Sequence, residues 1–226
     1  PEGAQHGWKS DIQVPNQITW EPFFVQELDW IFSDAIKRIV TFDDQDRNGV
    51  IIRGVTRGID QKMFLSLLKT QRRFKADQSI ELAPQGVESP AGGTDESSVE
   101  AIDEASIMSQ VRADILNGGY YLIDYRGYAG YNPADNVVNI VAMGSPATEA
   151  IKASRALLER GLYANVIICT SSDLLLGNQA HGNEYAHLKQ TLGVTGDLYL
   201  KGLDANDAGE VRTLAGRRIP VVSVHD

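Results

Sequence analysis

The chain has 226 residues, of which 42% are apolar and 23% charged, so its composition allows an ordinary hydrophobic core in one large or two small domains. Its formal net charge of −9 argues against a nucleic-acid backbone or an anionic membrane as the main partner. The only cysteine, Cys169, excludes an intrachain disulfide and a multi-cysteine metal site, which fits a reducing cytoplasm. No apolar run reaches the roughly 20 residues that cross a bilayer.

The first half of the chain begins its regular structure with a predicted helix over 19–40. Thr19 is expected to cap this helix, and Pro22 falls in its first turn, where proline is tolerated. A short apolar run at 50–55 predicts a buried strand, and 59–68 predicts a second, shorter helix. The first helix is predicted from apolar residues at three- and four-residue steps: Trp20, Phe23, Phe24, Leu28, Ile31, Ala35 and Ile39.

The middle of the chain alternates between polar loops and regular elements. The stretch 75–98 is rich in Pro, Gly, Ser and acidic residues, and predicts a long surface loop. A helix over 99–117 is expected to stop at Gly118, and 120–124 reads as a strand. The segment 125–136 contains three tyrosines, two glycines and a proline, and we predict an interdomain linker there. Its tyrosines could line a groove or pack two domains together.

The clearest unit follows this linker. A nearly continuous apolar strand at 137–143, a helix over 146–160 and a second strand at 164–170 have the size of a right-handed βαβ crossover. Strands of this kind are buried on both faces, so the predicted fold class is α/β, with mostly parallel sheets and helices on both faces. Apolar runs at 198–203 and 219–224 would extend the sheet. Cys169, inside the second strand, is predicted to be a core residue.

Few residues are candidates for chemistry. His6 lies in a loop-like segment, and its imidazole suits proton transfer or donation to a developing oxyanion; the alternative is a solvated surface histidine. His181 and His187 flank Glu184 in HGNEYAH, which differs from the HExxH zinc helix, so we predict no metal site. The turn at 144–145 precedes a helix and could bind an anion, although an ordinary capped turn is the simpler interpretation.

Four segments in this order carry a resemblance to a known family: EGAQH, VPNQITWEPFFVQELDWI, VIIRGVTR and VVNIVAMGSPATEAIKASRALLERGLYANVIICTSSDLLLG. They resemble the homodimeric-type decarboxylating component of the pyruvate (2-oxoacid) dehydrogenase complex, which depends on thiamin diphosphate, and more distantly transketolase. The resemblance implies the latter part of a pyrimidine-binding domain over 1–124, including the loop 75–98. It then implies the linker 125–136 and the first part of a transketolase-like C-terminal α/β domain over 137–226, so both domains would be incomplete.

The resemblance also implies an activity. An enzyme of this family decarboxylates a 2-oxoacid such as pyruvate and passes the acyl unit to a lipoyl group, an oxidoreductase reaction that follows glycolysis. The implied cofactors are thiamin diphosphate and Mg²⁺, bound mainly by regions absent from this chain. The implied partners are the missing remainder of the same polypeptide, a second copy in a homodimer, the lipoyl acyltransferase component and a small 2-oxoacid.

Only one site residue can be carried over from the family. His6 matches the first histidine of the family's GEGLQHEDGHS-like loop, and would lie near the cofactor's thiazolium and the substrate as a catalytic group. The next residues, GWKSD, depart from the family's HEDGHS-like continuation, so only His6 is carried over, and no cofactor-binding residue of this chain is named. The 226 residues alone are not expected to be the catalyst. Two alternatives remain open: a transketolase-like ketol transferase, and a non-catalytic dimerisation or assembly module.

Overall fold

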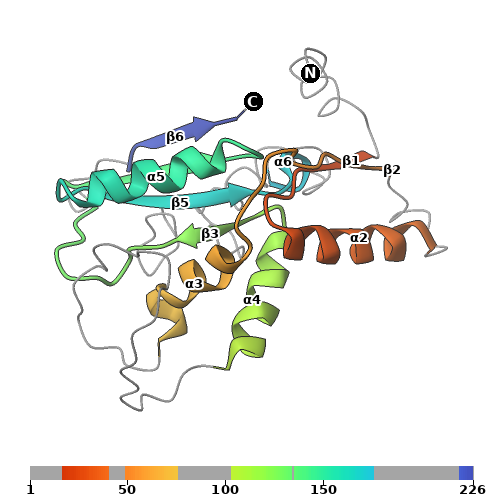
Figure 1. Cartoon of the computed structure of the whole chain (residues 1–226), viewed down its shortest axis with the longest axis horizontal. Helices are drawn as coiled ribbons and strands as arrows, with labels where there is room; N and C mark the ends of the chain where they lie inside the picture. The colour runs from red at the N-terminus through yellow and green to blue at the C-terminus, as the bar shows by residue number, and fades with distance from the viewer. Residues whose placement is uncertain (1–16, 41–48, 76–102, 134, 176–218, 226) are drawn as a thin grey trace.

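The computed structural model describes residues 17–40, 49–75, 103–133, 135–175 and 219–225 (Figure 1). The predicted strand at 198–203 and all but the first residue of the loop 75–98 lie outside these ranges. None of the described helices is long and apolar enough to cross a membrane. The elements in chain order are β1 (Gln17–Trp20), α2 (Val25–Val40), β2 (Gly49–Ile52), α3 (Lys62–Lys69), η1 (Arg72–Phe74), α4 (Glu104–Leu116), β3 (Gly119–Ile123), β4 (Val137–Ala142), α5 (Ala147–Leu158), β5 (Tyr163–Cys169), α6 (Ser172–Leu175) and β6 (Val221–Val224).

The described strands form two sheets. β1 and β2 pair in parallel, with Gln17 opposite Gly49 and Trp20 opposite Ile52. The second sheet has the order β3-β5-β4-β6, in which β4 is parallel to both β5 and β6 while β3 is antiparallel to β5. The predicted α/β class with mostly parallel strands is therefore confirmed, and so is the expectation that 219–224 extends the sheet. α5 connects β4 to β5 and packs against both strands.

The start of the first predicted helix is wrong. Residues 17–20 form β1, whose last carbonyl, that of Trp20, accepts a 2.8 Å hydrogen bond from the backbone N–H of Arg53. Thr19 therefore lies in a strand and caps nothing. The apolar period of this stretch fits a helix, but its β-branched and aromatic residues fit a pleated surface equally well, and parallel pairing with β2 makes it a strand. α2 itself begins at Val25 and ends at Val40.

The segment 125–136 is tied to both neighbouring parts of the chain. The Tyr128 hydroxyl donates to the carbonyl of Thr70 at the end of α3, and the Tyr163 hydroxyl donates to the carbonyl of Ala129 at 2.6 Å. Asn165 of β5 accepts from the backbone N–H of Tyr125 at 2.8 Å. The Tyr128 side chain therefore contacts the end of α3 and the backbone of the segment contacts β5, while the packing of two domains by the linker tyrosines stays a prediction.

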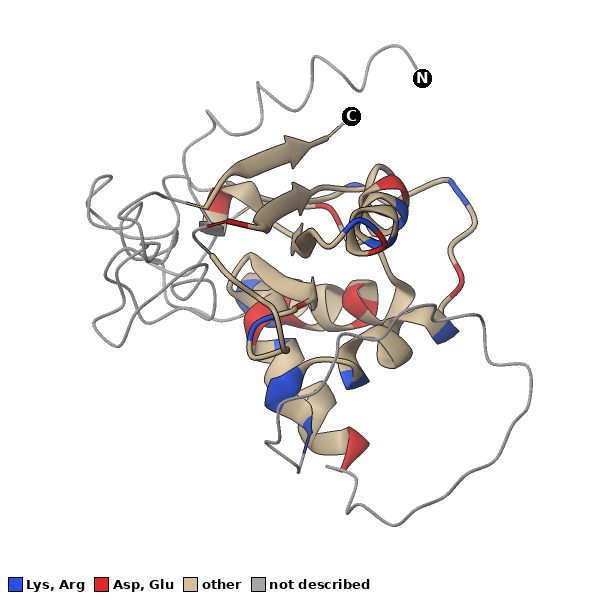
Figure 2. Ribbon diagram, turned by 90° about the vertical axis from the view of Figure 1, so that its left-hand side faces the viewer, with Lys and Arg blue, Asp and Glu red and all other residues tan. Residues whose placement is uncertain are grey.

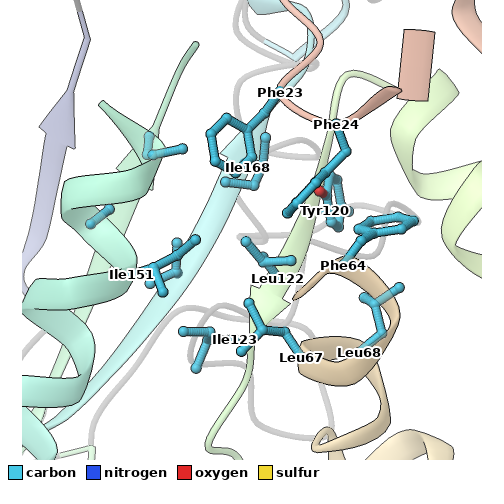
Figure 3. Packing of buried hydrophobic residues seen from close by; sticks show 14 of the residues in the cluster. Phe23, Phe24, Phe64, Leu67, Leu68, Tyr120, Leu122, Ile123, Ile151 and Ile168 are labelled. Atoms are coloured by element: carbon cyan, nitrogen blue, oxygen red, sulfur yellow. The ribbon is translucent and has the colours of Figure 1, made fainter. Parts of the chain in front are cut away.

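Residues on both sides of 125–136 also share one hydrophobic core. Figure 3 shows Leu122 and Ile123 of β3 between the side chains of α3 and those of β5 and α5. β3 falls within the range 1–124, yet it pairs with β5 from the range 137–226. The described sheet therefore begins before the segment 125–136, and the division of the whole chain into two domains at that segment stays a prediction.

Gly130 offers a test of this packing. Its φ is +82°, and a Cβ there would lie 2.8 Å from the Tyr163 hydroxyl, which binds the Ala129 carbonyl. We expect Gly130→Ala to lower the free energy of unfolding by about 2 kcal/mol, from backbone strain and the displaced hydrogen bond. Gly161→Ala is the matched control, because its φ is +76° but no atom lies within 4 Å of the added Cβ. Urea denaturation measures the free energy of unfolding of each variant. Equal losses of this free energy for Gly130→Ala and Gly161→Ala would contradict this account.

Candidate functional site

The two sheets meet at the carboxyl ends of their strands. Beyond β1, the backbone N–H of Glu21 donates to the carbonyl of Thr170, just beyond β5, at 2.8 Å. The N–H of Thr19 donates to the carboxylate of Asp173 in α6 at 2.6 Å. We call this place the sheet junction and define it by Thr19, Glu21, Arg53, Thr170 and Asp173. Ligands of α/β proteins commonly bind outside the carboxyl ends of parallel strands, so the junction is the candidate site among the described residues.

An ion pair lies at the centre of the sheet junction. The Arg53 guanidinium, just beyond β2, donates to the Glu21 carboxylate at 3.1 Å, and the two side chains are only 26% and 15% exposed. The other carboxylate oxygen lies 3.5 Å from the position that a Cβ on Gly144 would take. That distance is ordinary van der Waals contact, so a side chain would fit there, and it is the φ of +61° at Gly144 that favours glycine in the turn before α5. The Glu21 carboxylate, paired with Arg53, therefore lies beside the turn that precedes α5.

The first turn of α5 already uses its N–H groups. The N–H of Ala147 donates to the carbonyl of Gly144 at 3.2 Å, and that of Thr148 donates to the carbonyl of Ser145 at 3.3 Å. An anion would have to compete with these bonds. The structure therefore shows a hydrogen-bonded turn at 144–145 with no side-chain cap on α5, and it gives no support for anion binding there.

Cys169 ends β5, close to the junction. Its side chain is buried, and burial raises the pKa of the thiol to about 12, with a smaller contribution from the negative charge of Glu21. A thiol with such a pKa carries almost no thiolate at neutral pH. The prediction that Cys169 is a core residue is confirmed.

A buried acid that the sequence analysis missed lies at the start of α2. Glu27 has no exposed surface, and its carboxylate accepts from the backbone N–H of Phe23 at 2.6 Å and from the Tyr120 hydroxyl. Burial raises the pKa of Glu27 to about 7, against the hydrogen bonds, which lower it. Figure 3 places Tyr120 beside Phe24 and Phe64, in the apolar core. The pair joins α2 to β3 across 93 residues of sequence.

Charged residues elsewhere form ion pairs between elements, and Figure 2 shows acidic and basic positions side by side on the helices. Arg73 donates to Asp114 of α4 at 3.0 Å, and burial raises the pKa of this aspartate although Arg73 lowers it. Arg126 donates to Asp124 at 2.7 Å. The first pair therefore links η1 to α4, whereas the second is local to the segment just beyond β3.

The histidines and the glutamate that the sequence analysis considered are not among the residues that the structure describes. His6, His181, Glu184 and His187 all fall outside the described residues, so the catalytic role of His6 stays a prediction. Within the described ranges, no group of three His, Cys, Asp or Glu residues is placed to hold a metal ion. Glu27 is the third residue of α2, but the residue three positions earlier is Phe24 and not the Ser or Thr of a capping box, so no local sequence signal marks this glutamate.

Comparison with known proteins gives a weak signal. No family model matches the sequence, and no curated protein matches it. A mutant transketolase from Pichia stipitis in complex with fructose 6-phosphate is 16% identical, with a TM-score of 0.47, and the match covers 96% of this chain and 19% of that one. A second mutant transketolase from the same organism is 14% identical, with a TM-score of 0.45, and the match covers 97% of this chain and 19% of that one. A split-gene transketolase, described as an inactive tetramer, is 15% identical, with a TM-score of 0.38, and the match covers 95% of this chain and 50% of that one.

These similarities are too low to support an argument about function. The three TM-scores are below 0.5, and this chain spans about a fifth of the length of the two Pichia stipitis proteins. The activity of a whole transketolase therefore does not transfer to this chain.

Proposed function

We propose that this chain is part of a thiamin-diphosphate-dependent 2-oxoacid (pyruvate) dehydrogenase decarboxylating component. The observation that carries the proposal is the order of the four sequence segments, from the loop with His6 to the strand–Gly–Ser–helix–strand unit. The described fold is consistent with it, because the last segment forms β4, α5 and β5 with two parallel strands. The sequence is equally compatible with a 2-oxoacid other than pyruvate as the substrate.

The cofactor would be held mainly by other parts of the polypeptide. The described residues contain no cluster of ligands for Mg²⁺, so they do not fit the metal–diphosphate site. When bound, thiamin diphosphate supplies the electron sink for decarboxylation, and the protein positions the substrate and moves protons. In this proposal His6 holds or donates a proton at the oxygen of the reacting carbon, and the described core fixes the elements that follow its loop.

The proposed partners follow from the same family. They are the remainder of the polypeptide, a second copy, the lipoyl acyltransferase component and a 2-oxoacid, in the cytoplasm. The ketol-transferase and assembly-module alternatives make different predictions for one assay. The polypeptide containing this chain is purified from its source, supplied with thiamin diphosphate and Mg²⁺, and assayed with pyruvate plus lipoyl domain, or with a ketose phosphate plus an aldose phosphate. Reductive acylation of the lipoyl domain supports the proposal, ketol transfer supports the first alternative, and inactivity with both supports the second.

A binding measurement tests how the cofactor site is divided. We expect the 226-residue chain alone to bind thiamin diphosphate poorly, with a dissociation constant above about 1 mM in the presence of Mg²⁺, because diphosphate binding needs the metal and its ligands. Isothermal titration calorimetry measures this directly. Micromolar affinity for the isolated chain would contradict the assignment of the diphosphate site to other regions.

A further inference from the structure

A hollow of about 340 Å³ lies where α2 and α4 meet (Figure 1). We call it the α2–α4 hollow. Sites for small molecules commonly measure about 300–1,000 Å³, so this hollow has the size for a small ligand. None of its lining residues belongs to the sheet junction. They come from one face of each helix: Ser33, Asp34 and Lys37 of α2, and Ser109, Arg112, Ala113 and Leu116 of α4.

The charges in the α2–α4 hollow favour an anion. Among the lining residues, Lys37 and Arg112 are cationic and Asp34 is the one acid. The Asp34 carboxylate already accepts from Arg38 at 2.5 Å, one turn along α2. The hollow therefore sets two cations against one paired carboxylate, although the whole chain has a net charge of −9. Charges more than about 8 Å away are largely screened at physiological salt, so the lining residues dominate what a bound ion meets.

The donors in the α2–α4 hollow suit an oxyanion with several oxygens. The Arg112 side chain is exposed and forms no ion pair or hydrogen bond with any residue that the structure describes. Its guanidinium is a planar fork that matches two oxygens of a phosphoryl group. The Lys37 ammonium has three N–H donors, so it can donate to a ligand and keep its contacts within its own chain. The Ser109 hydroxyl adds a donor from the turn of α4 before Arg112.

The rest of the lining is apolar. Ala113 is exposed, and Leu116 is half-buried and packs against the hydrophobic core, which fixes its position. These two side chains lie on the same face of α4 as Arg112, one position and one turn further on. A ligand with a short carbon fragment beside its charged group would cover them.

We propose that the α2–α4 hollow binds a small phosphate monoester. The phosphoryl group lies between Lys37 and Arg112, and the carbon part of the ligand lies against Ala113 and Leu116. A phosphate monoester is a dianion above its second pKa, which is near 6, so its charge matches the two cations at neutral pH. This inference does not depend on the proposed function, because it uses neither His6 nor the sheet junction.

Phenyl phosphate is a suitable probe, because it has one dianionic group and one apolar ring. We expect a dissociation constant on the order of 1 mM at pH 7.5 and physiological salt, since both cations are exposed and charge-assisted contacts in water are weak. Titration of the 226-residue chain, followed by amide shifts in ¹H–¹⁵N NMR spectra, measures this constant. The absence of saturable binding up to about 20 mM would overturn the proposal.

Charge variants test where the phosphoryl group lies. Arg112→Gln should raise the dissociation constant of phenyl phosphate by at least about tenfold, because it removes the forked donor. Arg160→Gln is the matched control: it removes the same charge from an exposed arginine just beyond α5, and should change the constant by less than about twofold. Equal effects of the two variants would mean attraction by overall charge and would overturn the site. Far-UV circular dichroism shows whether each variant keeps its helices.

Two ligand comparisons test the class of ligand. Phenyl sulfate has the same ring and a single charge, so it should bind at least about fivefold more weakly than phenyl phosphate if both cations contact the ligand. Methyl phosphate lacks the ring and should also bind several-fold more weakly, because it leaves Ala113 and Leu116 uncovered. Equal affinity for phenyl sulfate would overturn the two-cation arrangement, and equal affinity for methyl phosphate would overturn the apolar contact.

A substitution inside the α2–α4 hollow gives an independent test. Ala113→Asp places a carboxylate among the lining residues and should weaken phenyl phosphate by at least about tenfold through like-charge repulsion. Ala156→Asp is its matched control, because Ala156 is an exposed alanine within α5, outside the hollow. Binding that tolerates Ala113→Asp, or that falls equally with Ala156→Asp, would overturn the proposal.

Discussion

His6→Ala is expected to lower the turnover of an enzyme containing this chain by about 10²–10⁴-fold, which is the usual contribution of a positioned acid–base group. Cofactor affinity should stay nearly unchanged, because an imidazole near the reacting carbon does not help to hold a diphosphate. The expected result is therefore a fall in kcat with little change in the concentration of thiamin diphosphate needed for activity. Steady-state kinetics with the 2-oxoacid, together with a cofactor titration, measures both quantities.

The pH profile separates a catalytic from a structural His6. An imidazole titrates near neutral pH, so loss of one limb of the profile should accompany the loss of rate. His225→Ala is a suitable control, because His225 is an exposed histidine beyond the last described strand. A His6→Ala enzyme with normal turnover and a normal pH profile would remove His6 from the site. It would also support the interpretation that the GWKSD segment has changed the loop.

The sequence predicts the second half of the described fold well. β4, α5 and β5 lie within two residues of the predicted bounds, because their apolar runs are continuous and Pro146 and Gly161 mark the helix ends. The predicted stop of α4 at Gly118 is also correct, and this glycine has a φ of 103°. Local signals of this kind need no information about distant residues, so periodicity and turn residues are enough to find them.

The same reasoning fails where distant residues decide the structure. β1 is a strand because it pairs with β2, some thirty residues later, and nothing local distinguishes it from the beginning of α2. The antiparallel direction of β3 likewise depends on β5. Within the sheet junction, the contact between Thr19 and Asp173 spans 154 residues. A helical period also overestimates burial, since Leu28 and Ile39 fit the predicted stripe but are exposed.

Glu27→Gln is expected to remove a pH dependence of stability. The pKa of Glu27 is about 7 in the folded chain and near 4.5 when the carboxyl is solvated, so the unfolded chain releases this proton first as pH rises. Between these two values the folded state binds one more proton, and its stability falls by about 1.4 kcal/mol per pH unit, roughly 3 kcal/mol in all. Stability from this group is fully present below pH 4.5 and is lost as pH rises through 7.

Urea denaturation at half-unit steps from pH 4.5 to 8 measures this effect as the difference between Glu27→Gln and the unaltered chain. The subtraction matters because Asp114 also has a raised pKa and adds a slope of the same sign to both proteins. Tyr120→Phe removes the hydroxyl that lowers the pKa of Glu27, so its slope should extend to higher pH. Glu149→Gln is the surface control: hydrogen bonds from Lys152 and Arg57 lower the pKa of its exposed carboxylate, so its titration falls at and below the low end of this range and leaves the slope toward pH 7 unchanged. Parallel curves for Glu27→Gln and the unaltered chain would mean that the carboxyl keeps an ordinary pKa, and that water reaches the joint between α2 and β3.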